Sequence, residues 1–353
     1  MTITELETPA LLLDWNAMQE NMTTMDNILR GTFMQLYPHY KSHKCPQIAL
    51  LQMSRGAVGI TCAKLSEAED LVGAGIGNVV IANQVVQYEK LPKLAALAHR
   101  CQLTVCVDDA DNIRDLEEAC AAEGSQLNIL VEYDVGMRRC GAGTYEEVLA
   151  LAQLVEAQEH LTFSGIQAYG GHLAHETDAE KRVRALMGIE EDVRELRNYL
   201  QDHGITVTHV AGGSTGTCAD KPQTSVYTQL QSGSYLFMDS SYEPLHLPFR
   251  QALYVLTTVI SVSPDRVVLD CGVKSLTMDQ RPPYFPAYPD AEVEFHEEHT
   301  ILRVKDSGLQ LGDMLMLVPG HCCTTNNTFE EFHVVNGSEL MHVWPIVSRG
   351  KAQ

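Results

Sequence analysis

Two lysines and two histidines crowd into the stretch PHYKSHK, which begins at Pro38. A lysine in an enclosed pocket can form a Schiff base when burial or a neighbouring charge lowers its pKa. The residue types alone leave two interpretations open. Lys41 and Lys44 could both face solvent, or one of them could be a nucleophile. The position of the stretch in the fold decides between them.

A second candidate site lies near the other end of the chain, in the stretch VPGHCCTTNN. His321 and Cys323 are separated by one residue, and on a β-strand such residues point to the same face. Imidazole and thiolate are both good ligands for Zn²⁺, although water, substrate or another side chain must complete the coordination shell. A buried histidine beside two core cysteines is the alternative for this fragment.

The chain alternates apolar, β-branched segments with amphipathic helical segments, which predicts a parallel β/α barrel. A doubly wound open sheet is the competing fold. The predicted barrel strands lie in FMQLY, AVGITC, NVVIAN, LTVCVD, LNILVEY, FSGIQAY, TVTHVAG and YTQLQSGSYLFM. We place the barrel at residues 15–242. A second, mostly antiparallel β domain comprises residues 243–353 together with residues 1–14.

A β/α barrel has its active site at the C-terminal ends of its strands. Unusual residues recur at these positions: Lys41 follows the first strand, Arg139 the fifth and the stretch YGGHLAH the sixth. The glycine-rich stretch GGSTGT follows the seventh strand, and SGS lies within the eighth. Such turns suit a phosphate held by backbone N–H groups, and their placement after the last strands of a barrel strengthens that interpretation.

The composition argues against several classes of partner. The 353 residues include 25 Lys+Arg and 46 Asp+Glu, and the formal net charge of −21 opposes binding to nucleic acid or to an anionic membrane. No apolar stretch is long enough for a transmembrane helix, and the first residues lack the pattern of a secretory signal. The ten cysteines form no CxxC pair and many occur in apolar segments, so we expect reduced thiols and a cytoplasmic protein.

Motifs along almost the whole chain are shared with a known family. They are, in order, ETPALLLD, PHYKSHKCPQIA, GAVGITCAKLSEAEDL, DVGMRRCG, GIQAYGGH, GGSTGT, QSGSYLFMD and PGHCCTT. In type and order they resemble the fold-type III pyridoxal-phosphate enzymes, in the branch that contains D-threonine aldolase, 3-hydroxy-D-aspartate aldolase and eukaryotic-type D-serine dehydratase. The resemblance implies that Lys41 binds pyridoxal 5'-phosphate (PLP) as a Schiff base.

The resemblance also implies roles for further residues around the cofactor. Arg139 matches an arginine that contacts the phenolic oxygen, and Gln167 and Tyr169 match residues that line the ring. Gln231 stands where the related alanine racemases have an arginine facing the pyridine nitrogen. The residues implied to bind the phosphate are Ser214, Thr215, Gly233 and Ser234.

His321 and Cys323 match the family's ligands for a divalent metal, which would be Zn²⁺, Mn²⁺ or Mg²⁺. Two signals in the family's motifs conflict. The aldolases have aspartate as the second ligand and the dehydratases have cysteine, whereas His175 in YGGHLAH matches the histidine base of the aldolases. In addition, Tyr37 replaces an arginine that usually precedes Pro-His, which leaves a charged contact near the cofactor in question.

We favour a lyase that cleaves D-3-hydroxy amino acids to glycine and an aldehyde, because His175 supplies the base that retro-aldol cleavage needs. The alternative is β-elimination to a 2-oxo acid and ammonia, as in a D-serine or D-threo-3-hydroxyaspartate dehydratase, with Lys41 removing the α-proton. An amino-acid racemase and a non-enzymatic PLP-binding protein are further alternatives, and the C-terminal β region argues against the second. The resemblance also implies a homodimer that binds a small-molecule substrate.

Overall fold

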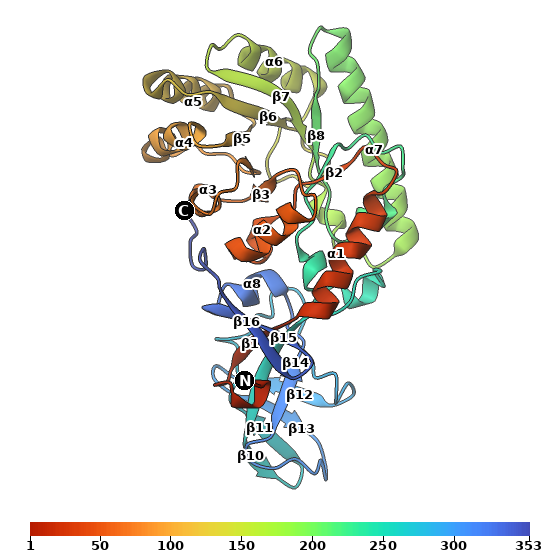
Figure 1. Ribbon diagram of the computed structural model, residues 1–353. Coiled ribbons are helices and arrows are strands. Elements are labelled where there is room, and N and C mark those ends of the chain that lie inside the picture. Colours follow the sequence, from red (N-terminus) through yellow and green to blue (C-terminus); the bar gives the residue numbers. More distant parts are fainter. The chain divides into compact units, whose positions relative to one another are not determined.

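A computed structural model describes residues 1–353, which form two compact units (Figure 1). The barrel unit comprises residues 27–41, 46–233 and 351–353, and the β unit comprises residues 1–26, 42–45 and 234–350. Both units are discontinuous in sequence. The division proposed from the sequence, with the barrel at 15–242, differs from this one: it assigns residues 15–26, 42–45 and 234–242 to the barrel and residues 351–353 to the β domain.

Eight parallel strands form the sheet of the barrel unit, in the order β2-β9-β8-β7-β6-β5-β4-β3. The Val58 N–H donates to the Leu36 carbonyl, and the Thr61 N–H donates to the Pro38 carbonyl, each at 3.0 Å. A parallel bridge between His39 and Thr61 joins the two ends of the sheet, so the predicted β/α barrel is confirmed. The strands are β2 (Gln35–Leu36), β3 (Ile60–Cys62), β4 (Asn78–Ile81), β5 (Gln102–Val107), β6 (Leu127–Glu132), β7 (Leu161–Gln167), β8 (His209–Gly212) and β9 (Gln229–Leu230).

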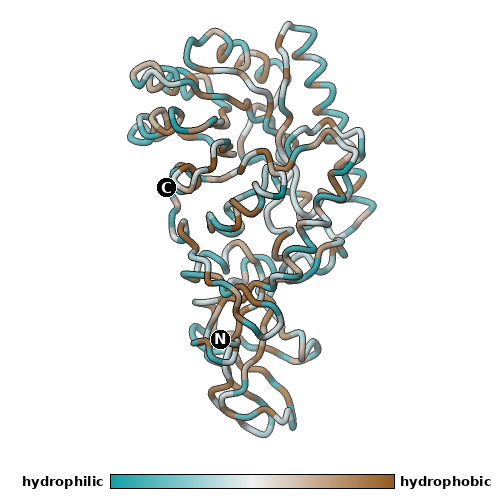
Figure 2. Tube along the Cα trace, in the orientation of Figure 1, coloured by the Kyte–Doolittle hydropathy of each residue, from teal (hydrophilic) through white to brown (hydrophobic).

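Helices alternate with these strands and pack against them through one large apolar core. They are α2 (Pro46–Ser54), α3 (Leu65–Gly73), α4 (Leu91–Ala98), α5 (Ala110–Glu123), α6 (Tyr145–Glu156) and α7 (Ala179–Asp202). Three of these helices begin at a residue whose side chain accepts a hydrogen bond from the first turn: Asp109 for α5, Thr144 for α6 and Asp178 for α7. Figure 2 shows hydrophilic residues along most of α7 and apolar residues in the strands, as expected for outer helices around a buried sheet. None of the helices combines the length and apolar character needed to cross a membrane.

A layer of side chains fills the interior of the barrel, and Tyr37 belongs to it. Tyr37 is buried and clusters with Val80, Cys106, Leu130 and Ala211, which come from four different strands. The position at which the family usually has an arginine is therefore part of the apolar interior in this chain.

A mostly antiparallel sheet forms the β unit, in the order β12-β13-β11-β10-β1-β15-β16, with β14 paired to β10. The only parallel pair joins β1 to β15, so the first strand of the chain belongs to this sheet, as predicted. Two helices, α1 (Trp15–Leu29) and α8 (Cys322–Asn326), lie between strands in the sequence. The strands are β1 (Ala10–Asp14), β10 (Leu253–Ser263), β11 (Arg266–Leu269), β12 (Glu292–Phe295), β13 (Thr300–Arg303), β14 (Met314–Leu317), β15 (Glu331–Asn336) and β16 (Glu339–Pro345).

Two local predictions are wrong. The stretch SGS does not lie within a strand, because β9 ends at Leu230 and a 3-10 helix begins at Ser234. The ladder is short there, since β9 pairs with only two residues of β2. His321 is likewise not on a strand: it caps the start of α8, and Pro-Gly precedes it after β14 has ended.

Candidate active site

A cavity of about 270 Å³ opens in the barrel unit beside the C-terminal ends of the strands. It brings together five residues that the sequence analysis assigned to the cofactor site: Lys41, Arg139, Gln167, Tyr169 and Gln231. The sequence analysis did not assign the remaining lining residues to this site; they are His39, Ala63, Ala82, Asn83 and Cys140. Most of these residues directly follow a strand, which is why residues distant in sequence converge here.

Lys41 lies in the 3-10 turn Tyr40–Ser42, which is separated from the end of β2 at Leu36 by residues 37–39. Its side chain lines the cavity, and Nζ lies 5.8 Å from the centroid of the Tyr169 ring. The Lys41 N–H donates to Nδ1 of His39 at 3.4 Å, and the His39 N–H donates to the Ser232 carbonyl at 3.2 Å. These bonds fix the backbone just before the lysine, so its amine is presented to the cavity from an ordered turn.

Tyr169 lies within reach of two cations. Besides Lys41, the guanidinium carbon of Arg139 lies 5.5 Å from the centroid of the Tyr169 ring, a distance at which a cation and an aromatic face attract each other. A Cβ on Gly171 would lie 2.5 Å from Cε1 of Tyr169. The glycine in the YGGH motif therefore leaves room for the tyrosine ring in this position.

Glu132, at the end of β6, is the anionic neighbour of Arg139. Its Oε1 lies 3.9 Å from Nη2 of Arg139, and its Oε2 accepts a hydrogen bond from Nε2 of Gln84 at 2.6 Å. Burial raises the pKa of Glu132, while Gln84 and Arg139 oppose that rise. The sequence analysis did not select Glu132, because it occurs inside the apolar stretch LNILVEY.

The glycine-rich turn after β8 is compact and buried. Gly212 has a φ of +151° and Gly213 a φ of +80°, and a Cβ on Gly213 would lie 2.7 Å from Cδ1 of Leu230. The Ser214 and Thr217 hydroxyl oxygens lie 3.1 Å apart. Only glycine allows this close approach and this backbone conformation.

The predicted base and phosphate ligands are not among the residues that line this cavity. His175 is half-buried and follows the 3-10 turn Gly171–Leu173. Ser214 and Thr215 are buried in the turn after β8. Gly233 belongs to the barrel unit and Ser234 to the β unit.

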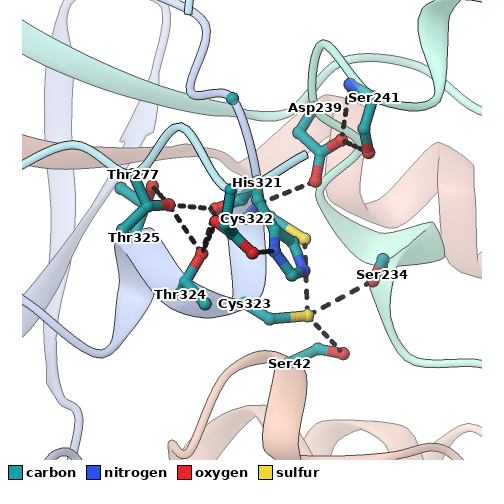
Figure 3. A network of polar contacts seen from close by, with 12 residues as sticks. Ser42, Ser234, Asp239, Ser241, Thr277, His321, Cys322, Cys323, Thr324 and Thr325 are labelled. Carbon is teal, nitrogen blue, oxygen red and sulfur yellow. Dashed lines mark hydrogen bonds and ion pairs between the residues drawn. The ribbon is translucent and has the colours of Figure 1, made fainter. Parts of the chain in front are cut away.

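The predicted metal pair meets in the β unit, although not by strand geometry. His321 caps α8 and Cys323 lies in its first turn, and their side chains are hydrogen-bonded (Figure 3). The sulfur of Cys323 lies 3.5 Å from the hydroxyl oxygen of Ser42 and 3.5 Å from that of Ser234. The buried carboxylate of Asp239 accepts a hydrogen bond from the Cys322 N–H at 2.7 Å, which satisfies the first turn of α8.

Neighbouring groups shift the pKa values of both His321 and Cys323. Burial lowers the pKa of His321, but its contacts with Cys323 and Asp279 raise that pKa more, to about 9. The pKa of the Cys323 thiol is lowered by a hydrogen bond with Cys322 and by His321, against the opposing effect of burial. The arrangement thus favours a thiolate beside an imidazolium.

The donor set of this pair fits a divalent metal. An imidazole nitrogen and a thiolate sulfur are ligands that Zn²⁺ prefers. No group of three or more His, Cys, Asp or Glu side chains in the chain could hold a metal ion, so water and substrate oxygens would fill the remaining positions. Cys322 and Cys323 have sulfurs 3.9 Å apart, and none of the ten cysteines forms a disulfide.

Comparison with known proteins identifies the family. A model of the alanine racemase N-terminal domain matches residues 13–241, and a model described as a putative serine dehydratase domain matches residues 252–335. A D-threonine aldolase of Arthrobacter sp. is 38% identical over 357 residues, which cover 99% of this chain and 94% of the relative. This chain belongs to the D-threonine aldolase family.

Other members of the D-threonine aldolase family match over a similar length. A 3-hydroxy-D-aspartate aldolase of Paracoccus denitrificans strain Pd 1222 is 36% identical over 364 residues, with 99% of this chain and 94% of the relative covered. The crystal structure of D-threonine aldolase from Filomicrobium marinum has a TM-score of 0.97 and 37% identity, and the match covers 100% of this chain and 98% of that one. Relatives named as dehydratases are more distant, at 21% to 25% identity.

Membership of the D-threonine aldolase family confirms the predicted resemblance and the predicted enzyme class, a PLP-dependent lyase. The residues present fit PLP. A lysine amine, a guanidinium and an aromatic ring open on one cavity. The buried turn after β8 carries the hydroxyl groups of Ser214 and Thr215, and it leaves no room for a Cβ on Gly213.

Proposed function

We propose that this protein cleaves D-3-hydroxy amino acids to glycine and an aldehyde, using PLP and a divalent metal. The main observation in support is the cavity that collects Lys41, Arg139 and Tyr169 at the ends of the barrel strands. The relatives with 36% and 38% identity are both named as aldolases, which supports cleavage of the carbon–carbon bond.

In this proposal Lys41 is the covalent anchor of PLP, and Arg139 faces the phenolic oxygen. Tyr169, Gln167 and Gln231 would line the cofactor ring, and the two glutamines, hydrogen-bonded to each other, would give it a neutral polar surface. The phosphate ligands are Ser214, Thr215, Gly233 and Ser234. When bound, PLP withdraws electrons from the bonds to the substrate α-carbon.

His175 acts as the general base and takes the proton of the substrate β-hydroxyl group, directly or through one water. Loss of that proton drives cleavage between Cα and Cβ, so the β-carbon leaves as an aldehyde and the bonding electron pair stays with the α-carbon. The α-carbon then takes up a proton, which gives glycine. His321 and Cys323 hold the metal. When bound, a divalent metal acidifies a hydroxyl group that it coordinates.

A specific observation favours β-elimination as the second candidate. Cys323 gives the metal site a thiol, whereas the family's aldolases have aspartate at the corresponding position. In that reaction Lys41 removes the α-proton and hydroxide leaves from the β-carbon, with a 2-oxo acid and ammonia as the products.

The test is product analysis with D-threonine, PLP, and either Zn²⁺ or Mn²⁺. Glycine and acetaldehyde support the proposal, whereas 2-oxobutanoate and ammonia contradict it in favour of elimination. D-threo-3-hydroxyaspartate is tested as a second substrate, in case the site prefers a β-carboxylate. If neither substrate yields glycine, the proposal is also contradicted. His175→Asn should lower kcat about 10²- to 10⁴-fold. His172→Asn is the matched control, because His172 is an exposed histidine in the 3-10 turn that precedes His175.

We further propose that the protein is a cytoplasmic homodimer, an expectation that comes from the family resemblance and from the reduced cysteines. Light scattering coupled to size-exclusion chromatography measures the mass directly. A mass near that of one chain, 39.1 kDa, would contradict the dimer.

A further inference from the structure

We propose that Asp279 is a positioning residue of the metal site, which orients the His321 imidazole so that Nε2 is available to the metal. This inference rests on one part of the proposed function, metal binding by His321 and Cys323. Asp279 precedes His321 by 42 positions and lies outside every motif of the sequence analysis.

The contact between the two side chains is direct. Oδ2 of Asp279 lies 2.7 Å from Nδ1 of His321, a normal distance for a charge-assisted hydrogen bond. When Nδ1–H donates to the carboxylate, the lone pair of the neutral ring is on Nε2. Metal-binding histidines usually donate their other ring N–H to such an acceptor, which fixes the ring orientation and makes the imidazole a stronger ligand.

Asp279 is itself held by the helix that carries Cys323. Its Oδ1 accepts a hydrogen bond from the Thr324 hydroxyl at 2.9 Å. The Thr277 hydroxyl oxygen lies 2.6 Å from that of Thr324 and 3.0 Å from that of Thr325. The carboxylate therefore has both oxygens engaged, one with the imidazole and one with α8.

The backbone is also adapted to this contact. A Cβ on Gly320 would lie 2.1 Å from the Arg281 carbonyl oxygen and 2.5 Å from that of Thr277. The segment on either side of Asp279 thus packs directly against the residue before His321, and only glycine allows that approach. This close packing distinguishes the pair from an ordinary exposed ion pair, which contributes little.

Asp279 does not have the geometry of a third ligand. It contacts Nδ1, whereas Figure 3 shows the other ring nitrogen directed at the sulfur of Cys323. The chain contains no group of three His, Cys, Asp or Glu side chains that could share one ion. The carboxylate therefore acts through the imidazole.

The test measures metal affinity, not turnover. Chelator-treated protein with PLP is titrated with Zn²⁺ and with Mn²⁺ against a chromophoric chelator, for wild type, Asp279→Ala, Asp279→Asn and His321→Ala. Asp279→Ala should weaken affinity about 10- to 100-fold, and Asp279→Asn less, because its amide oxygen still accepts from Nδ1. Asp265→Ala is the control and should leave affinity unchanged, since this carboxylate is similarly exposed but pairs with Arg266.

Each outcome has one meaning. Metal-free Asp279→Ala should melt somewhat below wild type, because the bonds of the carboxylate with His321 and Thr324 are lost, and added metal should raise its melting temperature less than that of wild type. If wild type binds metal and both Asp279 variants bind equally well, the inference is wrong while the proposed metal site stands. If Asp279→Ala loses binding as completely as His321→Ala, Asp279 is a ligand and the positioning role is also wrong. If wild type binds neither metal, the metal part of the proposed function fails, and the inference fails with it.

Discussion

Gln167 and Gln231 exchange two hydrogen bonds at the base of the cavity. Nε2 of Gln167 donates to Oε1 of Gln231 at 2.8 Å, and Nε2 of Gln231 donates to Oε1 of Gln167 at 3.1 Å. Both side chains are buried. Gln167 is the last residue of β7 and Gln231 directly follows β9, the two strands on either side of β8. The pair gives the cavity a polar but uncharged base, in which each amide satisfies the other.

Replacing one of these glutamines should cost more than replacing both. Gln167→Met or Gln231→Met leaves the remaining amide buried with an unpaired group, which should lower the free energy of unfolding by about 1–3 kcal/mol. The double variant replaces both amides by apolar side chains of similar shape and should lose less than the sum. Urea denaturation of the four proteins gives the coupling energy, and strictly additive losses would contradict the pairing.

Lys41→Ala should abolish the visible absorbance that PLP acquires when it binds the protein covalently. The reason is that Lys41 is the lysine side chain that opens on the cavity. Lys93→Ala, at an exposed position of α4, is the control and should absorb like wild type. Normal absorbance in the Lys41 variant would exclude it as the anchor.

Cys323→Ala should reduce the response of activity to added metal, because it removes the sulfur donor beside His321. The measurement is activity as a function of Zn²⁺ or Mn²⁺ concentration after chelator treatment. Cys101→Ala is the control, since Cys101 is a partly buried cysteine of the barrel unit. An unchanged metal response would remove Cys323 from the ligand set.

Gly59→Ala tests how Tyr37 fits in the barrel interior. A Cβ on Gly59 would lie 2.7 Å from Cε1 of Tyr37 and 2.8 Å from Cγ of Asn78, so the variant should lose about 1–3 kcal/mol of unfolding free energy. Gly188→Ala is the matched control, because a Cβ there meets nothing within 4 Å. Because Gly188 lies in the middle of α7, its replacement by alanine should instead raise the unfolding free energy of the protein by about 0.5–1 kcal/mol. If Gly59→Ala and Gly188→Ala changed the unfolding free energy equally, the contact with Tyr37 would not limit the side chain at position 59.

His209 makes stability depend on pH. Burial lowers its pKa from the ordinary value of 6.5, so the unfolded chain takes up the proton first as the pH falls. The contribution of His209 to stability is therefore present above about pH 6.5 and is lost below it. Between about pH 7.5 and pH 5.5, wild type should lose more unfolding free energy than His209→Gln. His299→Gln, an exposed control, should follow wild type, and parallel curves for all three proteins would contradict the prediction.

Local patterns were sufficient to predict most of the barrel. The apolar, β-branched segments predict β3 to β8 because each is a buried strand flanked by turn residues. The pattern fails at YTQLQSGSYLFM, because the length of β9 depends on the two-residue strand β2 beside it, which is distant in sequence. The sequence also places His321 and Cys323 together but gives them strand geometry, which Pro319 and Gly320 prevent.

Residues defined by long-range contacts could not be found in this way. Asp279 lies in no motif, and only folding brings it to His321. Glu132 lies in an apolar strand, and its place in the site is defined by its contact with Arg139 in the following loop. Tyr37 departs from the family's arginine in the sequence, but its position in the barrel interior depends on side chains from four strands.

The pairing of β2 with β9 has a consequence for synthesis. The Gln35 N–H donates to the Thr228 carbonyl, and the Tyr37 N–H donates to the Leu230 carbonyl, so the strand before Lys41 depends on residues made near the end of the barrel. Because translation proceeds from the N-terminus, Lys41 is synthesised well before Thr228 and Leu230. The Lys41 amine therefore reaches its final place only after the last barrel strand has been translated, and an incomplete chain lacks the finished cavity that Lys41 lines.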